Sequence, residues 1–433
     1  MAAQFRGFEG RTKMKVMIIG SGGREHTLAW KIKQSPLVDK LYCAPGNGGI
    51  ASLAECVPIK AMDIDGVVSF AKKEKIDLVM VAPDDPLAAG MVDALQEAGI
   101  RAFGPVKAAA IIEGSKAFSK ELMKKYNIPT ADYEIFDNSN AAIEYLKTSK
   151  YPVVVKADGL ALGKGVIIAQ SFEEASGAVL DMMSSKIFGK AGDRVVIEEF
   201  ITGPEVSILA FTDGTTIVPM VSSQDHKRAL DNDQGLNTGG MGAFSPSRVY
   251  DKKTAEFCME NIFLPTMNAM NSENRKFKGV LYFGLMLTAE GPKVLEYNAR
   301  FGDPETQVVL PRLKTDIIEI FNAIIDEKLD TVNIEWEDNA AVCVILASGG
   351  YPGKYATGLE IKGIDDAEKD PAVVVYHAGT KLQDGKYLTS GGRVLGVTAL
   401  ADTMDGAREK AYTAIKKISF DNMHYRKDIG IKY

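Results

Sequence analysis

Histidine and cysteine are scarce in this sequence, and no long apolar run is present. The 433 residues include 4 histidines and 4 cysteines, and the cysteines (Cys43, Cys56, Cys258 and Cys343) are far apart, without a Cys-x-x-Cys pair. A zinc site or a disulfide framework is therefore not expected, and we interpret all four as reduced packing residues. The longest apolar runs have the length of a strand, well short of the roughly 20 residues of a membrane-spanning helix.

Positive charge is not in excess either. The chain has 51 Lys and Arg against 57 Asp and Glu, a formal net charge of -6, so nothing favours nucleic acid or a membrane surface as a partner. With 46% hydrophobic and 25% charged residues it has the composition of a globular protein, and its length predicts about two to four domains. The polar residues 1–13 contain no apolar signal core, so we interpret them as a disordered extension or cloning remnant and expect a cytoplasmic protein.

From Met14 to about residue 112, short apolar runs alternate with amphipathic stretches such as the helix expected at about 25–34. Strands separated by helices predict a doubly wound parallel sheet. The strands end in the turns "GSGGREH", "APGNGG" and "APDDP". Ligands of such sheets bind outside the carboxyl ends of the strands, so residues 14–112 are expected to form a domain that holds a small anionic ligand.

The turn "GSGGREH" has three interpretations. Its glycines and the following helix N-terminus suit a monophosphate or ribose phosphate, which we favour. A dinucleotide fingerprint would need a third glycine where Glu25 stands, and an acidic residue after the second strand, which ends in "CAPG". A purely structural strand-to-helix turn also stays open.

A different pattern begins near residue 113. A lysine-rich helix is expected to stop before Ile128-Pro129. The loop in "KADGLALGKG" joins two apolar strands with three glycines and two lysines, so it could close over phosphates, although a plain hairpin is an alternative. In "VVIEEFITGPE", Glu198 and Glu199 stand at a strand end, where they could contact an adenine ring, and Glu205 could reach its ribose. The alternative interpretation is two solvated glutamates on an edge strand.

The stretch "VLEYNARFGDPETQ" places several polar groups on one strand. Alternation puts Glu296, Asn298 and Arg300 on one face, opposite Leu295 and Tyr297. Two oxygen ligands on one face suit Mg²⁺, which completes its shell with water and phosphates, and the arginine can contact a carboxylate or a transferred phosphoryl group. A solvated sheet face is the alternative, and "DPE" is interpreted as a turn and helix cap.

The C-terminal part, residues 338–433, contains three apolar strand patterns followed by a helix, and we expect a small α+β unit with its own strands. His377 enters a strand-end turn, where a packed and hydrogen-bonded histidine is more common than a catalytic base.

Taken in order, "GSGGREHTLAW", "GSKAF", "KADGLALGKGV", "SQDHKRALDNDQGLNTGGMGAFSP", "LEYNARFGDPETQ", "HAGT" and "SGGRVLGVTA" resemble the glycinamide ribonucleotide synthetase family of the ATP-grasp superfamily. The resemblance runs from Met14 to the C-terminus. It implies a multidomain α/β and α+β fold: an N-terminal domain at 14–112, an ATP-grasp domain at 113–337 with a mobile lid at about 135–200, and a C-terminal domain at 338–433. The implied activity is ATP-dependent joining of glycine to 5-phosphoribosylamine through glycyl phosphate, in purine biosynthesis.

The resemblance also implies roles for individual residues. The ATP site would comprise Lys116, Lys156, Gly159, Gly163, Lys164, Gly165, Glu198, Glu199, Ile201 and Glu205. Mg²⁺, with Mn²⁺ as an alternative ion, would be held by Glu296 and Asn298. The catalytic groups would be Arg300, Lys227 and Asp225. The substrate contacts would be Gly22, Gly23, Arg24, Gly46, Asn47 and Asp84 for phosphoribosylamine, and His226, Gly239 and Gly240 on the glycine side.

Two departures from the family pattern stand out. Asp84 occupies a position where a glutamate is expected, so its contact is one methylene shorter. The strand before "LEYN" is wholly apolar, so a ligand for a second metal ion cannot be named. We expect a monomer whose partners are small molecules. The rival functions are another ATP-grasp carboxylate-amine ligase or carboxylase, and a nucleotide-binding oxidoreductase resting on "GSGGRE".

Overall fold

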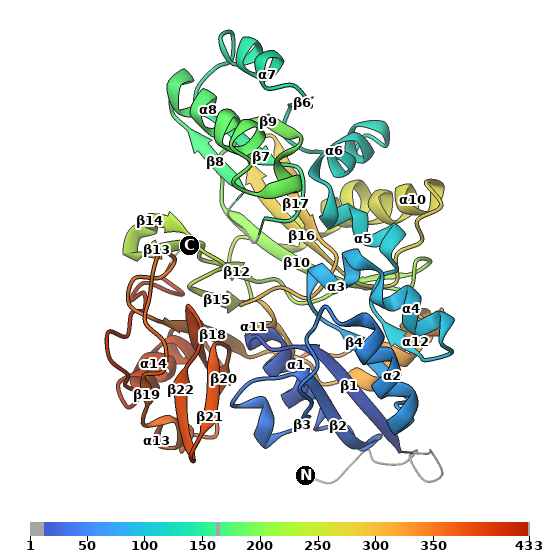
Figure 1. The fold of residues 1–433 in the computed structure, drawn as a ribbon, viewed down its shortest axis with the longest axis vertical. Coiled ribbons are helices and arrows are strands. Elements are labelled where there is room, and N and C mark those ends of the chain that lie inside the picture. Colours follow the sequence, from blue (N-terminus) through green and yellow to red (C-terminus); the bar gives the residue numbers. More distant parts are fainter. Residues whose placement is uncertain (1–12, 162–164, 432–433) are drawn as a thin grey trace.

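The computed structural model describes residues 13–161 and 165–431. The predicted extension at 1–12, together with Gly163 and Lys164 of the predicted lid loop, lies outside the described residues. Figure 1 shows a broad lower body, made of an N-terminal and a C-terminal part, and an upper lobe that projects from it. The predicted multidomain α/β and α+β fold is confirmed.

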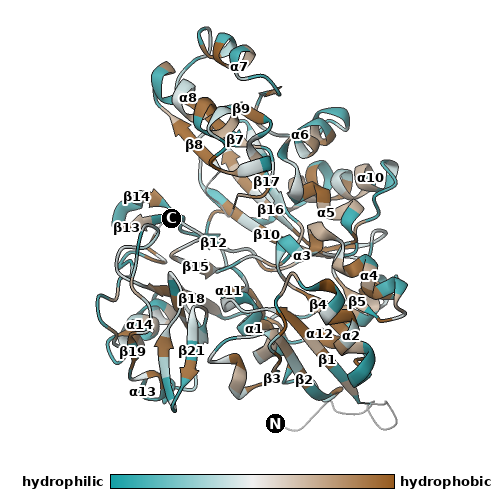
Figure 2. Ribbon diagram, viewed as in Figure 1, coloured by the Kyte–Doolittle hydropathy of each residue, from teal (hydrophilic) through white to brown (hydrophobic). Residues whose placement is uncertain are grey.

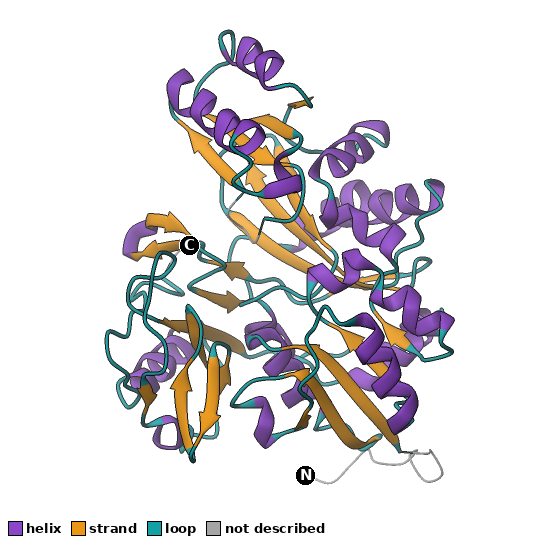
Figure 3. Ribbon diagram, viewed as in Figure 1, coloured by secondary structure: helices purple, strands orange, loops and turns teal. Residues whose placement is uncertain are grey.

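The N-terminal sheet is parallel throughout, as expected for a doubly wound domain. Its strand order is β3-β2-β1-β4-β5. The strands are β1 (Met14–Gly20), β2 (Val38–Pro45), β3 (Glu55–Cys56), β4 (Leu78–Val81) and β5 (Ala102–Phe103). The helices are α1 (Gly23–Ile32), α2 (Ile64–Glu74), α3 (Asp84–Ala89) and α4 (Met91–Glu97). They flank the sheet in Figure 3.

Burial explains why the strands read as continuous apolar runs. Val16, Met17, Ile18 and Ile19 of β1 are all fully buried, because both faces of the sheet are covered. Figure 2 shows the hydrophobic colouring along β1. Helix α1 starts at Gly23, two residues earlier than expected, because the Glu25 carboxylate accepts a hydrogen bond from the Gly22 N–H and caps the first turn.

The central part contains two antiparallel sheets. The upper lobe holds β6 (Tyr133–Phe136), β7 (Val153–Ala157), β8 (Val166–Ala169) and β9 (Val195–Glu199), in the order β6-β9-β7-β8. Helices α7 (Ser139–Leu146) and α8 (Phe172–Val179) pack on this sheet. Below it lie β10 (Glu205–Thr212), β11 (Ile217–Pro219), β16 (Gly279–Thr288) and β17 (Gly291–Asn298), in the order β11-β10-β16-β17. The bend at 200–204 therefore crosses from one sheet to the other.

Several helices surround the lower of these two sheets. They are α5 (Lys107–Gly114), α6 (Lys116–Lys125), α9 (Lys252–Cys258), α10 (Leu264–Ser272) and α12 (Ile317–Ile325). Helix α11 (Thr306–Val309) instead packs against α1, β15 and β18. Helix α6 ends before Pro129, as its sequence predicts. Among the described residues no helix is both long and apolar enough to span a membrane.

The C-terminal sheet differs from expectation, because two of its strands come from the central part of the chain. Its order is β12-β15-β18-β23-β20. The strands are β12 (Gln224–Asp225), β15 (Gly242–Ser245), β18 (Ala340–Ala347), β20 (Val373–His377) and β23 (Arg393–Ala401). The three expected C-terminal strands β18, β20 and β23 are present, and β12 and β15 extend their sheet, since β15 pairs with β18 from Gly242↔Val344 to Ser245↔Ala341.

The remaining C-terminal elements are small. They are β19 (Glu360–Ile361), α13 (Ile364–Ala367), β21 (Thr380–Gln383), β22 (Lys386–Thr389) and α14 (Met404–Ile415). A separate two-stranded hairpin of β13 (Arg228–Leu230) and β14 (Gln234–Asn237) stands between β12 and β15 in the chain. It lies above the C-terminal sheet in Figure 1.

Candidate active site

A cavity of about 820 Å³ opens where the upper lobe, the lower central sheet and the two lower parts meet. Residues from all of them line it, among them Arg24, Lys156, Phe200, Lys227, Glu296 and Arg393. The volume lies in the range of ligand sites. It gathers groups from distant parts of the sequence, which short-range patterns alone could not place together.

Two lysines approach one end of the cavity from different elements. Lys116, at the start of α6, donates to the Gly159 carbonyl at 3.0 Å, and Lys156, on β7, donates to the Leu295 carbonyl at 3.2 Å. Burial holds the pKa of Lys116 below its usual range, although Glu296 opposes this effect. Both ammonium groups are thus oriented by protein oxygens in a site of phosphate-binding character.

Glu198 lines the cavity but is engaged by two lysines. The side chain is 2% exposed, with Oε1 2.9 Å from Lys156 Nζ and Oε2 2.9 Å from Lys120 Nζ. Burial lowers the pKa of Lys120 to about 8. The adenine contact assigned to Glu198 stays a prediction.

The bend after β9 forms the apolar wall of the same end. Phe200, Ile201 and Gly203 line the cavity. The Glu199 carboxylate accepts a hydrogen bond from the Asp132 N–H at 3.1 Å and faces the β6 side. Glu205, assigned to the ribose, has its Oε2 3.4 Å from Lys227 Nζ. Glu199, Ile201 and Glu205 thus line one cavity, and their contacts with ATP stay predictions.

Glu296 and Asn298 project from β17 into the cavity. The Glu296 side chain is 35% exposed, and its Oε1 lies 3.6 Å from Lys227 Nζ. Burial would raise the pKa of Glu296, but Lys227, Lys156 and Lys116 together hold it below its usual range. One carboxylate and one amide oxygen facing the same cavity fit a hard divalent cation that needs few protein ligands.

A β-bulge at Leu295 modifies the expected alternation. Gly284 pairs with Glu296, but Leu285 pairs with Val294, so Leu295 is the extra residue. Leu295 therefore lines the cavity instead of packing in the core, where Val294 and Tyr297 are buried. The bulge leaves the Leu295 carbonyl free to accept from Lys156.

No group of three or more histidine, cysteine, aspartate or glutamate side chains is arranged to hold a metal ion in the described ranges 13–161 and 165–431. The assignment of a metal ion to Glu296 and Asn298 stays a prediction.

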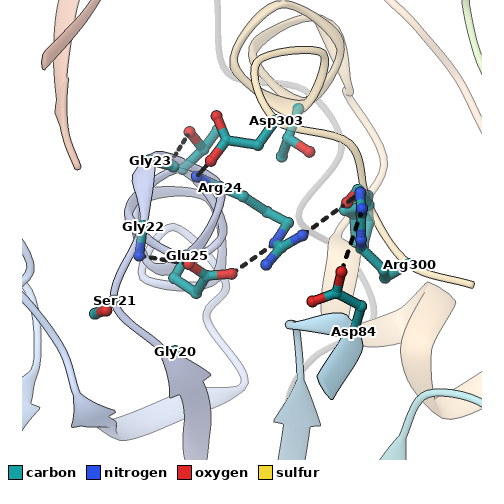
Figure 4. A network of polar contacts seen from close by, with 12 residues as sticks. Gly20, Ser21, Gly22, Gly23, Arg24, Glu25, Asp84, Arg300 and Asp303 are labelled. Carbon is teal, nitrogen blue, oxygen red and sulfur yellow. Dashed lines mark hydrogen bonds and ion pairs between the residues drawn. The ribbon is translucent and has the colours of Figure 1, made fainter. Parts of the chain in front are cut away.

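Arg300 links the strand end to the N-terminal domain. Its Nη2 lies 2.8 Å from Glu113 Oε1 and 3.8 Å from Asp84 Oδ2, and it donates to Asn298 Oδ1 at 3.4 Å. Figure 4 shows Asp84 and Arg300 facing each other. Burial would raise the pKa of Asp84, but Arg300 and Arg24 lower it below its usual range.

The N-terminal turns meet the "FGDPE" segment in the same region. Arg24 Nε donates to Glu25 Oε1 at 2.6 Å, and its Nη1 donates to the Phe301 carbonyl at 3.2 Å. Figure 4 places Gly22, Gly23 and Arg24 around the start of α1, facing Asp303. Because Glu25 folds over the turn, a side chain fills the space that a dinucleotide would need.

The "APGNGG" loop lies beside the same turn. Asn47 Nδ2 donates to the Ser21 carbonyl at 2.9 Å and to the His377 carbonyl at 2.8 Å. Gly46 has a φ of +75° and the Cβ of any other residue would lie 2.4 Å from Cys56 Sγ, so glycine is required there. His377 is buried, and its N–H donates to His26 Nδ1 at 2.6 Å, which is a packing role.

Asp225, His226 and Lys227 also line the cavity. Burial raises the pKa of Asp225 to about 7, although Lys227 opposes the shift. His226 is buried, with its ring 5.9 Å from that of Phe244. The arrangement offers a carboxylate and an ammonium group next to Glu296, which suits a zwitterionic ligand.

Gly239 and Gly240 are held next to this group by the C-terminal domain. Arg393 Nη1 donates to the Gly239 carbonyl at 2.7 Å and to the Asp303 carbonyl at 2.7 Å. Gly240 has a φ of +111°, and an added Cβ would lie 2.5 Å from Pro304 Cδ. The loop therefore needs glycine for close approach.

Pattern reading missed several residues of the cavity: Glu113, Lys120, Tyr282, Glu305 and Arg393. Arg393 stands in the "SGGRVLG" stretch that carries the family resemblance, so the sequence could have indicated it as a site residue. Glu305 was interpreted as part of a turn and helix cap, and it is the N-cap residue of α11, although its side chain makes no capping hydrogen bond. Its Oε1 accepts from Ser207 Oγ at 3.2 Å and Tyr282 Oη at 3.1 Å.

Comparison with protein families accounts for most of the chain. Residues 14–113 match the model described as phosphoribosylglycinamide synthetase, N domain, residues 114–306 its ATP-grasp (A) domain, and residues 341–432 its C domain. The chain is 51% identical over 420 residues to a phosphoribosylamine–glycine ligase of Caldanaerobacter subterraneus subsp. tengcongensis, covering 97% of this chain and 100% of that protein. It is 49% identical over 421 residues to one of Salmonella typhi, covering 96% and 98%.

Solved structures agree with this grouping. The crystal structure of phosphoribosylamine–glycine ligase from Thermotoga maritima matches with a TM-score of 0.84 and 32% identity, covering 96% of this chain and 99% of that one. A biotin carboxylase from Campylobacter jejuni matches with a TM-score of 0.73 at 14% identity, covering 97% and 94%. The second likeness shows a shared fold alone.

Proposed function

The chain belongs to the phosphoribosylglycinamide synthetase family. On this basis we propose which residues of the cleft bind each substrate and which stabilise the transferred phosphoryl group. It is an ATP-dependent ligase of purine biosynthesis that joins glycine to phosphoribosylamine. The observation that carries the proposal is the convergence of Lys116, Lys156, Glu296 and Arg300 on one cavity.

The first step forms an acyl phosphate. A carboxylate oxygen of glycine attacks the γ-phosphorus of ATP, the bond from that phosphorus to the bridging oxygen breaks, and ADP leaves. Lys116 and Lys156 hold the phosphates, and Arg300 stabilises the charge that develops during transfer. The bend at 200–204 and the backbone at 199–201 hold the adenine.

Glu296 and Asn298 would hold Mg²⁺, or Mn²⁺ in its place. When bound, the ion neutralises phosphate charge and fixes the geometry of the transferred group. Lys227 keeps Glu296 ionised and positioned for this task, as the lowered pKa of Glu296 supports.

Glycine is held between Asp225 and Lys227, whose charges complement its ammonium and carboxylate groups. Phosphoribosylamine is placed on the other side, along Gly22, Arg24, Asn47 and Asp84. In the second step its amine attacks the acyl carbon, the bond from carbon to the phosphate oxygen breaks, phosphate leaves and the amine loses a proton. Closure of the cleft protects the acyl phosphate from water.

The rival functions lose support at specific points. Family membership over the N, A and C models separates the chain from carboxylases that share only the fold. The Glu25 side chain in the first turn disfavours a nicotinamide dinucleotide there.

We also propose a monomer in the cytoplasm. All four cysteines are free, which suits a reducing compartment. Sedimentation of the purified protein would test the oligomeric state.

Isotope transfer tests the chemistry. Glycine labelled with ¹⁸O in both carboxylate oxygens is incubated with ATP, Mg²⁺ and freshly generated phosphoribosylamine, and the released phosphate is analysed by mass spectrometry. One label in each phosphate is expected, because one carboxylate oxygen leaves with phosphorus. Unlabelled phosphate formed along with product would contradict the acyl phosphate.

A further inference from the structure

The last part of the described chain forms a strap, residues 424–429, between helix α14 and the β13–β14 hairpin. On the α14 side, Tyr412 Oη donates to the Arg426 carbonyl at 2.8 Å, and Arg408 Nη2 donates to the Lys427 carbonyl at 3.0 Å. The strap also pairs with β18, since the His424 N–H donates to the Ala347 carbonyl at 2.9 Å. One side of the strap is thus fixed to the C-terminal domain.

The other side of the strap is bound to the hairpin through a buried arginine. Arg426 is fully buried, and its Nε and Nη2 donate to Asp428 Oδ1 and Oδ2 at 2.8 and 2.6 Å. Its Nη1 donates to Asp233 Oδ1 at 2.9 Å and to the Arg228 carbonyl at 3.1 Å. The two-pronged contact with Asp428 lies within the strap and fixes the guanidinium group, and the third nitrogen, Nη1, makes the contacts with the hairpin.

Three further hydrogen bonds join the same two segments. The Lys427 N–H donates to Asp231 Oδ1 at 2.7 Å, and the Asn232 N–H donates to Asp428 Oδ2 at 2.8 Å. His424 Nε2 donates to the Ala229 carbonyl at 2.7 Å. The strap therefore contacts the hairpin from its first strand to its turn.

The hairpin needs such an anchor. It forms a two-stranded sheet of its own, with the register Arg228↔Asn237 and Leu230↔Gln234. Leu230 is 48% exposed and Leu236 is 67% exposed, so little apolar packing holds it. Isolated two-stranded hairpins are marginally stable in water.

The base of the hairpin leads directly into the cavity. The Thr238 N–H donates to the Lys227 carbonyl at 2.7 Å. This hydrogen bond continues the pairing of the two hairpin strands by one residue beyond Arg228 and Asn237. Lys227 Nζ then reaches Glu205 and Glu296 at 3.4 and 3.6 Å. A displacement of the hairpin would therefore move Lys227.

We propose that Arg426 and Asp428 are positioning residues for glycine, acting through the hairpin on Lys227 and the loop at Gly239. This inference rests on the proposed function, since it takes glycine to bind next to Lys227. The strap does not touch the substrate. It positions Lys227 and the loop at Gly239, which contact glycine in the proposed function.

The test compares Arg426→Met with the matched control Lys427→Ala. The control removes a positive charge one position along the strap but keeps the backbone contact of residue 427 with Asp231. Arg426→Met should raise the KM for glycine by about tenfold or more, the effect of losing charge-assisted hydrogen bonds. The KM for phosphoribosylamine should stay within about twofold, because the N-terminal loops hold that substrate without help from the hairpin. The control should change neither value.

Hydrogen exchange supplies a readout that does not depend on activity. In Arg426→Met, the amides of residues 228–237 should exchange faster, whereas those of β18 and β23 should keep their protection. Asp231→Ala, a change on the hairpin itself, provides a variant that leaves the C-terminal core intact. It should raise the KM for glycine in the same direction by about threefold, the effect of one lost hydrogen bond.

Two results would overturn the inference. One is faster exchange in the hairpin with an unchanged KM for glycine in both variants. The other is an equal rise in the KM for glycine and for phosphoribosylamine, which would indicate a general defect. Failure of the proposed function is distinguishable from both, because the unsubstituted protein would then release no ADP on addition of glycine.

Discussion

Glu198 on β9 and Lys156 on β7 form a buried ion pair at one end of the cleft, with Oε1 and Nζ 2.9 Å apart. The second oxygen of Glu198 pairs with Lys120 at the same distance. Lys156 also donates to the Leu295 carbonyl of β17, so it joins the upper lobe to the lower central sheet. A phosphate that binds Lys156 can replace the Leu295 carbonyl while Glu198 keeps the lysine in place.

This arrangement predicts a double effect for Glu198→Gln. Removing one partner of a buried ion pair costs about 3–5 kcal/mol, so the free energy of unfolding should fall by an amount of that order. The KM for ATP should rise by roughly tenfold, because Lys156 loses the partner that orients it. Denaturant unfolding and steady-state kinetics measure the two effects.

Glu199→Gln is the matched control. Its side chain is 43% exposed and lies 3.7 Å from Lys293, so both the stability and the KM for ATP should change little. If Glu198→Gln raised the KM for ATP with no loss of stability, a direct adenine contact would explain Glu198 better than the ion pair does.

Glu296 and Asn298 predict unequal effects on turnover. Glu296→Gln removes the charged oxygen of the pair and should lower kcat by about two orders of magnitude at ordinary Mg²⁺. Asn298→Asp keeps an oxygen and adds charge, so its loss should be smaller. Titration of activity with Mg²⁺ checks this, and near-native activity of Glu296→Gln would contradict the metal assignment.

The shortened residue at position 84 can be tested by restoring its length. Asp84 Oδ2 lies 3.8 Å from Arg300 Nη2, beyond hydrogen-bond distance, and one methylene adds about 1.5 Å of reach. Asp84→Glu should therefore retain the KM for phosphoribosylamine or lower it, whereas Asp84→Ala should raise it by roughly tenfold. The KM for ATP should be the same in both variants, and a rise in it would argue for a structural role instead.

Local patterns predicted the strands and the parallel N-terminal sheet, because a continuous apolar run such as Val16 to Ile19 is typical of a strand that is buried on both faces. They could not predict which sheet a strand joins. The pairing of β15 with β18 depends on contacts between segments far apart in the chain, and the division of β9 and β10 between two sheets likewise depends on long-range pairing.

The same limit applies to the cleft. Glu296, Asn298 and Arg300 are close in the sequence, so alternation along the strand was enough to group them. Two features of the cleft depend on contacts between distant segments: the ion pair of Glu198 with Lys120, and the bulge at Leu295. Neither the packing of distant segments nor the register of two strands can be predicted from the local sequence pattern.

The last prediction concerns pH and Asp225. Burial raises its pKa from the usual 3.8 to about 7, against the opposing effect of Lys227. In the unfolded chain the group ionises near its usual pKa, so between about pH 4 and pH 7 the folded protein binds more protons at this site than the unfolded one. Asp225 therefore contributes a loss of stability as the pH rises through this range, and a constant penalty above it.

Asp225→Asn should remove that contribution. Relative to the unsubstituted protein, the variant should gain stability at about pH 8 and gain little at about pH 4, and the difference between the two isolates this group because the other titrating residues are shared.

For catalysis, kcat/KM for glycine should rise with pH through about 7 in the unsubstituted protein, as the carboxylate ionises and can pair with the glycine ammonium. The amide introduced by Asp225→Asn carries no such charge, so the variant should lack this limb and have a raised KM for glycine. Thermal unfolding at both pH values and a pH–rate profile measure these effects. A stability difference that is the same at both pH values would show that Asp225 ionises normally in the fold, and an unaltered pH–rate profile would separate it from glycine binding.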